Sequence, residues 1–143
     1  MIAIACDHGG YKLKLEVMKH LDERGIEYKD FGCDNEEPCD YPEYAHKVGN
    51  AIISGECRLG VLICGTGIGM SIAANKINGI RASVCNDCYT AELTREHNDA
   101  NVLAMGARVI GVGVALKVVD TFLDTPFSND ERHLRRIAQI ERV

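Results

Sequence analysis

A cysteine followed by three alternating glycines is the part of this sequence that points most directly to chemistry. The apolar run Val61–Cys64 ends at Cys64, and Gly65, Gly67 and Gly69 follow before an Ala-rich helical pattern. This order predicts a buried strand, a tight turn and the N-terminus of a helix. Backbone N–H groups and the helix dipole make such a turn positive, which favours a bound anion and a thiolate. We therefore expect a reactive sulfur beside an anion-binding turn.

Three better-known phosphate motifs do not fit this segment. A dinucleotide fingerprint that starts at Gly65 needs a glycine where Met70 stands. A P-loop needs a Gly-Lys-Ser/Thr tripeptide, which the sequence lacks. The small cysteine phosphatases use Cys-x5-Arg, and counting from Cys64 puts Met70 at the arginine position. Because a methionine cannot hold a phosphoryl group, a cysteine phosphatase is excluded.

Length and charge limit the class of protein. The 143 residues predict a single domain, spanning 1–143. The net charge of −5 does not suggest a nucleic-acid partner or an anionic membrane, and no apolar run is long enough to span a bilayer. The segment 1–8 has no basic n-region, so it is not a signal peptide. Seven cysteines without an export signal predict reduced thiols and a cytoplasmic location.

The pair Cys85 and Cys88 forms a Cys-x-x-Cys motif. Such a motif can be a redox pair or half of a zinc site. A four-ligand zinc site needs a second close pair, and the sequence has none. We expect two unrelated thiols at a strand-to-helix turn, and no metal.

Stretches of strand and helix pattern alternate along the whole chain. The expected strands are Ile2–Cys6, Ile26–Phe31, Leu59–Cys64, Ile80–Cys85 and Val102–Met105. The expected helices are Gly10–Arg24, Pro42–Ser54, one that begins at Met70–Lys76, Asp87–His97, Gly113–Asp124 and Asn129–Arg142. The expected apolar face of the first helix consists of Tyr11, Leu15, Met18 and Leu21. This alternation predicts an α/β fold with a five-stranded, mostly parallel sheet and helices on both faces.

In such folds, ligands bind beyond the carboxyl ends of the strands. Asp7 and His8 follow the first strand, Cys64–Gly69 the third, and Asn86 and Asp87 the fourth, so these candidate residues are expected at that edge. His97 and Asn98 end a helix instead, and their position needs another explanation. The last helix has no part of the sheet left to cover, so we expect it to pack on a second subunit.

Several segments of the chain stand in the order in which a known family carries them. They are Cys6–Gly10, Asp40–Pro42, Cys64–Gly69, Ala73–Lys76, Gly79–Ala82, Arg95–Asn101, and Arg132 and His133 with Arg136. With these segments the chain resembles the family of ribose-5-phosphate isomerase B. The wider family also holds allose-6-phosphate isomerase and the galactose-6-phosphate isomerase subunits.

The resemblance implies an enzyme that interconverts an aldose phosphate and a ketose phosphate without metal or organic cofactor. It implies a Rossmann-like three-layer sandwich with an extra C-terminal helix. It also implies a homodimer or a dimer of dimers with active sites at the subunit interface. The family has two versions of the catalytic turn, and Cys64 with Met70 resembles the cysteine version. The other version has Gly and Glu at these two positions.

The reaction moves a proton between C2 and C1 through an enediolate, which requires a base and a group for the oxyanion. Cys64 is the expected base. Thr66 is expected to donate or relay a proton, although it also suits a helix N-cap. The N–H groups of Gly65, Gly67 and Gly69 are expected to hold the oxyanion.

Opening the sugar ring requires a further group that exchanges protons near neutral pH, and His97 is the candidate. Asp7 is expected to orient a sugar hydroxyl or a histidine, although it also suits an N-cap. Asn98 and Tyr41 have polar ends suited to sugar hydroxyls. Without the resemblance, a helix-terminal role for His97 and a packing role for Tyr41 would be preferred.

The phosphate needs fixed cations. Arg132 and Arg136 are four residues apart and so share one helical face, and arginine is the preferred partner of a phosphate. The resemblance adds His8, and Arg108 after the fifth strand is a weaker candidate. The plainer alternative is a solvated basic face.

Ribose 5-phosphate is the substrate that the resemblance favours, with ribulose 5-phosphate as the product. One alternative is an isomerase of a six-carbon sugar phosphate, such as allose 6-phosphate or galactose 6-phosphate. Another is a non-catalytic sugar-phosphate-binding subunit. The joint presence of Cys64, Thr66 and His97 argues against the second alternative.

Overall fold

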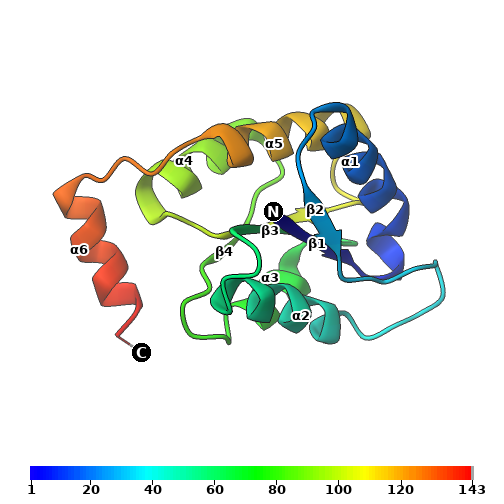
Figure 1. Cartoon of the computed structure of the whole chain (residues 1–143), viewed down its shortest axis with the longest axis horizontal. Coiled ribbons are helices and arrows are strands. Elements are labelled where there is room, and N and C mark those ends of the chain that lie inside the picture. Colours follow the sequence, from blue (N-terminus) through cyan, green and yellow to red (C-terminus); the bar gives the residue numbers. More distant parts are fainter. Residues whose placement is uncertain (143) are drawn as a thin grey trace.

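Five short strands form one parallel sheet at the centre of the molecule (Figure 1). The structure is a computed structural model and describes residues 1–142. The strands are β1 (Ile2–Cys6), β2 (Tyr28–Asp30), β3 (Leu59–Cys64), β4 (Ala82–Val84) and β5 (Val102–Gly106). Their order is β2-β1-β3-β5-β4, and every pair of neighbours is parallel. All residues of β1, β3 and β5 are buried, as expected for parallel strands covered on both faces.

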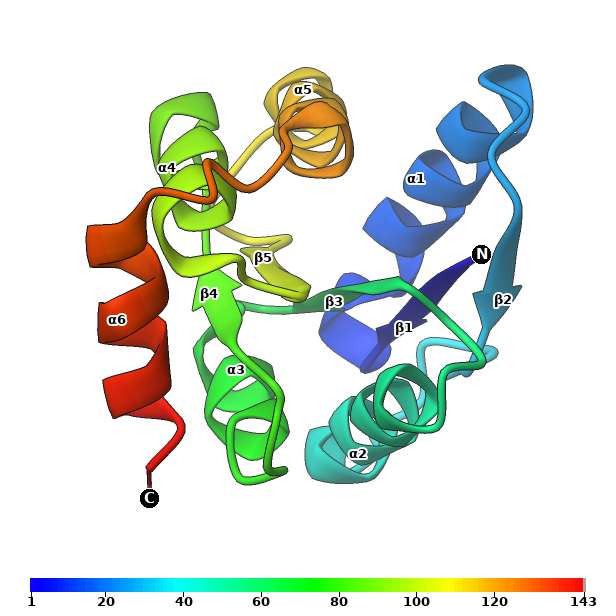
Figure 2. The ribbon, with the colours of Figure 1, turned by 60° about the vertical axis from the view of Figure 1, so that its left-hand side comes forward.

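Helices cover both faces of the sheet, which confirms the three-layer α/β sandwich (Figures 1 and 2). One face carries α1 (Tyr11–Glu23), α4 (Cys88–Asn98) and α5 (Val112–Asp124), and the other carries α2 (Tyr41–Ile53) and α3 (Ile68–Ala74). Because successive strand residues point to opposite faces, β3 supplies both apolar layers. Val61 and Ile63 pack in the first layer, and Leu62 and Cys64 pack in the second.

The final helix, α6 (Glu131–Ile140), stands beside the sandwich rather than on the sheet (Figure 2). Its only buried residue is His133. Leu134 and Ile140 are 48% and 51% exposed, so the apolar side of α6 is largely uncovered within residues 1–142. The expected extra C-terminal helix is confirmed. No helix within residues 1–142 is both long enough and apolar enough to cross a membrane.

The element boundaries differ from the expected ones mainly at the two edge strands. The predicted strands Ile26–Phe31 and Ile80–Cys85 shorten to three residues each, because only Tyr28–Asp30 and Ala82–Val84 face a neighbouring strand. The sheet expected to be mostly parallel is parallel throughout. The helix expected from Met70 already begins at Ile68, and the first helix follows a short 3-10 turn at His8–Gly10.

The predicted apolar face of α1 was wrong. Its buried residues are Leu13, Lys14, Val17 and Leu21. Leu15 is 44% exposed, and Tyr11 and Met18 are only half-buried. The helix buries a different face from the one that apolarity alone favours. Lys14 lies on the buried face because it bonds to Asp30 and to the Cys33 carbonyl.

Lys14 is fully buried and anchors α1 to the segment that follows β2. Its ammonium group donates to both carboxylate oxygens of Asp30 at 2.8 Å and to the carbonyl of Cys33 at 2.6 Å. Asp30 also accepts the N–H of Gly32. A buried cation requires such full pairing, since an unpaired charge in the interior is costly.

We expect Lys14→Met to destabilise the fold by about 3 kcal/mol, because it keeps the volume but leaves Asp30 without its partner. Lys29→Met is the matched control. Lys29 pairs with Glu56 at the surface, where such a pair contributes below about 1 kcal/mol. Urea unfolding of both variants measures the difference, and equal midpoints would contradict the stated role of Lys14.

Candidate active site

The turn after β3 holds a cysteine sulfur on a backbone hydrogen bond. Cys64 is the last residue of β3 and is 5% exposed, and its Sγ accepts the N–H of Gly67 at 3.0 Å. Gly67 has a φ of 80°, and a β-carbon there would lie 2.9 Å from the backbone of Met105. Only glycine meets both conditions. The expected tight turn is thus present, and its geometry aims an N–H donor at the sulfur.

The burial of the other cysteines provides a comparison with Cys64. All seven cysteines are free thiols, and none forms a disulfide. Burial raises the pKa of four of them, Cys6, Cys39, Cys57 and Cys85. No group of three or more potential metal ligands occurs within residues 1–142. Cys64 differs from these four in its setting, because it ends β3 at the glycine turn and its sulfur accepts a backbone N–H.

Two further predicted residues lie beside the turn. The Thr66 hydroxyl accepts the N–H of Ile68, the first residue of α3, at 3.2 Å and remains exposed, while the N-cap position itself is Gly67. A β-carbon at Gly69 would lie 2.7 Å from the ring of Tyr41. Tyr41 therefore lies directly over the first turn of α3. The N–H of Gly67 is committed to the Cys64 sulfur, which leaves Gly65 and Gly69 as candidates for holding an oxyanion.

Asp7 and His8 follow β1 at the same edge of the sheet. The Asp7 carboxylate is 8% exposed and accepts the N–H groups of Gly9 at 2.8 Å and Gly10 at 3.1 Å. It therefore caps the 3-10 turn, which was the plainer of its two expected roles. Nδ1 of His8 accepts the N–H of Cys39 at 3.3 Å, and this bond orients the imidazole.

Arg108 contributes the positive charge nearest to the sulfur-bearing turn. A β-carbon at Gly65 would lie 3.2 Å from its Nη1, and one at Gly9 would lie 3.6 Å from its Nη2. The guanidinium thus lies against Gly9 in the turn after β1 and against Gly65 in the turn after β3. Within residues 1–142 it forms no ion pair, so its charge is available to an anion. Arg108, the weaker phosphate candidate in the sequence, is the one that the fold brings to Cys64.

His97 and Asn98 lie at the opposite end of the sheet. Helix α4 runs back toward the amino ends of the strands, and the Asn98 carbonyl accepts a hydrogen bond from Arg81, the residue before β4. The two ends of a strand the length of β3 lie about 15–20 Å apart. A cavity of about 550 Å³ lies at this end, with Asn98 and Glu141 among its lining residues. Within one chain, His97 and Cys64 therefore cannot act on the same sugar carbon.

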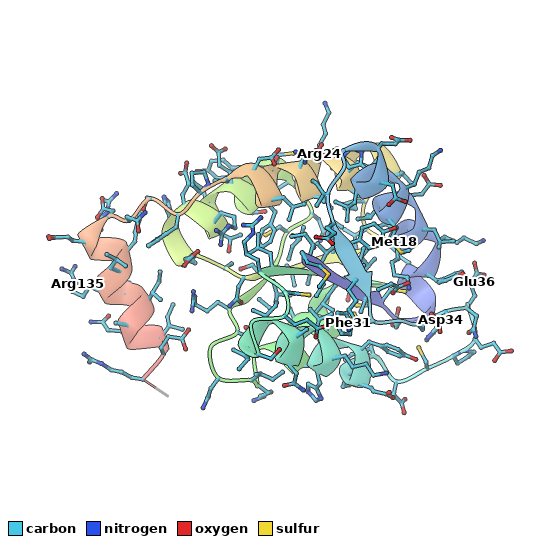
Figure 3. All side chains as sticks on the ribbon, in the orientation of Figure 1. Met18, Arg24, Phe31, Asp34, Glu36 and Arg135 are labelled. Carbon is cyan, nitrogen blue, oxygen red and sulfur yellow. The ribbon has the colours of Figure 1, made fainter. Side chains whose placement is uncertain are left out.

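Helix α6 lies with His97 at the amino ends of the strands, since His133 packs on His97 and Glu141 pairs with Arg81, the residue before β4. Figure 3 shows Arg135 of α6 at one end of the molecule, and Asp34 and Glu36 of the loop before Tyr41 at the other. Arg132 lies 3.5 Å from the Asp130 carboxylate, and Arg136 forms no ion pair within residues 1–142. Both side chains are exposed. The predicted site residues thus fall into two groups, one at each end of the sheet.

Two further residues lie near these groups, and neither was assigned a role from the sequence. The Asn86 side chain accepts the N–H of Gly106 at 3.0 Å and so supports the turn that carries Arg108. Its position after the fourth strand was the only available indication. The His133 ring lies 4.3 Å from the His97 ring, and no local pattern in the sequence predicts that contact.

Comparisons with known proteins show which family the chain belongs to. The model of the ribose/galactose isomerase family matches residues 2–140. Ribose-5-phosphate isomerase B of Escherichia coli is 49% identical over 142 residues, which cover 99% of this chain and 95% of the relative. The solved structure of ribose-5-phosphate isomerase B from Clostridium thermocellum matches with a TM-score of 0.96 at 52% identity, covering 98% of this chain and 94% of that one. A ribose 5-phosphate isomerase from Thermotoga maritima matches with a TM-score of 0.97 at 51% identity, covering 99% and 97%. The chain therefore belongs to the ribose/galactose isomerase family and is an aldose–ketose isomerase.

Proposed function

We propose that this protein interconverts ribose 5-phosphate and ribulose 5-phosphate, with Cys64 as the base. The observation that carries the proposal is the Cys64 sulfur, held by the Gly67 N–H beside the unpaired guanidinium of Arg108. The ribose 5-phosphate isomerases of Escherichia coli, Clostridium thermocellum and Thermotoga maritima, each about half identical to this chain, support the choice of substrate. A thiol base must stay reduced, which suits the cytoplasm.

The chemistry needs only proton transfers within the substrate. The thiolate of Cys64 takes the proton from C2 of the open-chain aldose, and the C2–H electrons form the enediolate. Return of that proton to C1 gives the ketose, while the proton on O2 moves to O1 through the Thr66 hydroxyl. N–H groups of the turn, such as those of Gly65 and Gly69, stabilise the negative oxygen. No metal or organic cofactor is required for these steps.

Ribose 5-phosphate must first be opened from its ring form, and we assign this step to His97. The anomeric hydroxyl loses a proton, the bond from C1 to the ring oxygen breaks, and that oxygen gains a proton. A single imidazole can accept the first proton and deliver the second, because histidine exchanges protons near neutral pH. Asn98, the next residue, is suited to hold sugar hydroxyls.

We further propose that two copies of the chain complete each active site. Cys64 and Arg108 lie at one end of the sheet, and His97 and Arg136 lie at the other, so a twofold dimer can bring the two ends together. Exposed apolar side chains support such a contact. Ile68 and Ile72 of α3 are 54% and 57% exposed beside the Cys64 turn, and one side of α6 is similarly uncovered. A dimer of such dimers would preserve the same sites.

In this arrangement the substrate phosphate is held from both sides. Arg108 and His8 of one copy face Arg132 and Arg136 of the other. Guanidinium groups are well suited to bind a phosphate, because each can form two parallel hydrogen bonds to it, and those of Arg108 and Arg136 have no carboxylate partner within residues 1–142. The distance from this phosphate site to Cys64 then selects the length of the sugar.

Replacing Cys64 by alanine tests the assignment of the base. We expect Cys64→Ala to lower kcat on ribose 5-phosphate by about 10²–10⁴, the usual cost of removing a catalytic acid–base group. Cys57→Ala is the matched control, since Cys57 is equally buried but precedes β3. Circular dichroism establishes that both variants are folded, and near-normal kcat in folded Cys64→Ala would rule out the thiol base.

Mixing two inactive variants tests the shared site. A hybrid dimer of Cys64→Ala and His97→Asn has one site with both groups intact and one with neither. Random exchange should therefore restore about a quarter of the wild-type rate, since half of the dimers are hybrids. Subunit exchange is verified by mass spectrometry. Exchange without recovered activity would show that Cys64 and His97 act from the same chain, and a monomer in light scattering would exclude the dimer.

Removing one phosphate contact tests the substrate class. Arg136→Ala should lower kcat/KM for ribose 5-phosphate by about ten- to a hundredfold, because a charge-assisted hydrogen bond is lost, while any weak turnover of free ribose stays unchanged. Arg135→Ala, one residue away on the same helix, should behave as wild type. The wild-type enzyme is assayed in parallel on allose 6-phosphate and galactose 6-phosphate. A higher kcat/KM on either would replace ribose 5-phosphate as the substrate and leave the isomerase mechanism in place.

A further inference from the structure

His133 is the one side chain of α6 that the protein buries. It is 6% exposed, whereas its helix neighbours Arg132 and Leu134 are exposed. Its imidazole ring lies against that of His97 on α4, with the ring centres 4.3 Å apart and the planes tilted by 35°. Burying a polar ring on a helix that is otherwise open to solvent needs a specific reason, because the polar atoms must keep their hydrogen bonds.

Ser128 supplies that hydrogen bond and joins three parts of the chain. Its hydroxyl lies 3.0 Å from Nδ1 of His133 and also accepts the N–H of Asp130. The Ser128 N–H donates to the carbonyl of Glu96, the residue before His97. The linker before α6 is thus bonded to the last turn of α4, and the His133 ring is fixed between this linker and His97.

The charges around His133 favour a neutral ring. Burial, the neighbouring His97 and the guanidinium of Arg132 lower the pKa of His133, as does Arg136, and the Asp130 carboxylate opposes them. A neutral His133 accepts the Ser128 hydroxyl at Nδ1 and carries its proton on Nε2. The His133 ring therefore adds no positive charge beside His97.

We propose that His133 is a positioning residue for His97. Its buried ring supports the His97 imidazole from the α6 side and couples it to the helix that carries Arg132 and Arg136. This inference rests on the ring-opening role of His97 in the proposed function. An imidazole that must take one proton from the sugar and give another to its ring oxygen requires a defined orientation. At a half-exposed helix end, a neighbouring ring can provide that orientation.

A purely structural role for His133 would have different consequences. If the ring only docked α6 onto α4, its removal would displace the phosphate-binding arginines. KM would then rise for every phosphorylated substrate, whether cyclic or open. If His133 positions His97, only the substrate that requires ring opening should be affected.

Two substrates and three variants separate these possibilities. The second substrate is 4-deoxyribose 5-phosphate, which has no hydroxyl placed to close a five-membered ring. We expect His133→Ala to lower kcat on ribose 5-phosphate by about ten- to a hundredfold and to leave kcat on the 4-deoxy compound nearly unchanged. His133→Phe keeps an aromatic ring against His97 and should recover most of the loss. His20→Ala is the matched control, because it removes another helix–helix contact, between His20 and Asp120.

A double variant adds a second criterion. In a His97→Asn background, His133→Ala should cause little further loss, because a positioning residue has no effect once its partner is gone. Equal losses on both substrates with a raised KM, or wild-type kcat in His133→Ala, would overturn the inference.

The contact can also be followed without any assay. In NMR spectra of the histidine rings, His133→Ala should shift the His97 ring signal because it removes a ring current, and His20→Ala should not. An unmoved His97 signal would overturn the inference whatever the activity. If the wild-type protein isomerises no sugar phosphate, the proposed function fails separately, and a shifted His97 signal would then preserve the contact but remove its catalytic meaning.

Discussion

The turn after β3 and the turn after β5 are hydrogen-bonded to each other through their backbones, and this contact fixes the surroundings of Cys64. Ala107 donates to the Cys64 carbonyl at 2.8 Å, and Arg108 donates to the Gly65 carbonyl at 3.0 Å. A β-carbon at Gly106 would come within 2.8 Å of the Thr66 backbone. The two turns approach each other this closely only because glycine has no side chain. A thiol and a guanidinium are thereby held on adjacent strands without a flexible linker.

The same parallel topology explains why Cys64 and His97 lie at opposite ends of the sheet. Every helix in a strand–helix–strand unit must return to the amino edge before the next parallel strand begins. Residues at the end of α4, such as His97, are therefore carried away from Cys64 at the end of β3. In the dimer proposed above, a second copy of the chain would bring the two ends together. The uncovered apolar side of α6 is consistent with such an association.

The structural features that were predicted correctly share one property, which is that their setting is local. The strand, turn and helix around Cys64 lie within one continuous window, so residue types and spacing were sufficient to predict them. The position of Asp7 at the carboxyl end of β1 was predicted in the same way, from the apolar run that precedes it. The buried face of α1 was mispredicted because Lys14 is stabilised by Asp30 and the Cys33 carbonyl, which lie in a later segment. Apolarity within the helix contains no information about those partners.

The sequence alone thus determined the alternation of strands and helices, the parallel sheet and the cysteine turn, since each depends on neighbouring residues. The tertiary structure decided which residues meet. It placed Arg108 rather than Arg136 against the Cys64 turn, and it set His133 against His97. Such contacts depend on strand order and on where each helix leaves the sheet. These are set by packing between segments far apart in the chain, which no local pattern of residue types encodes.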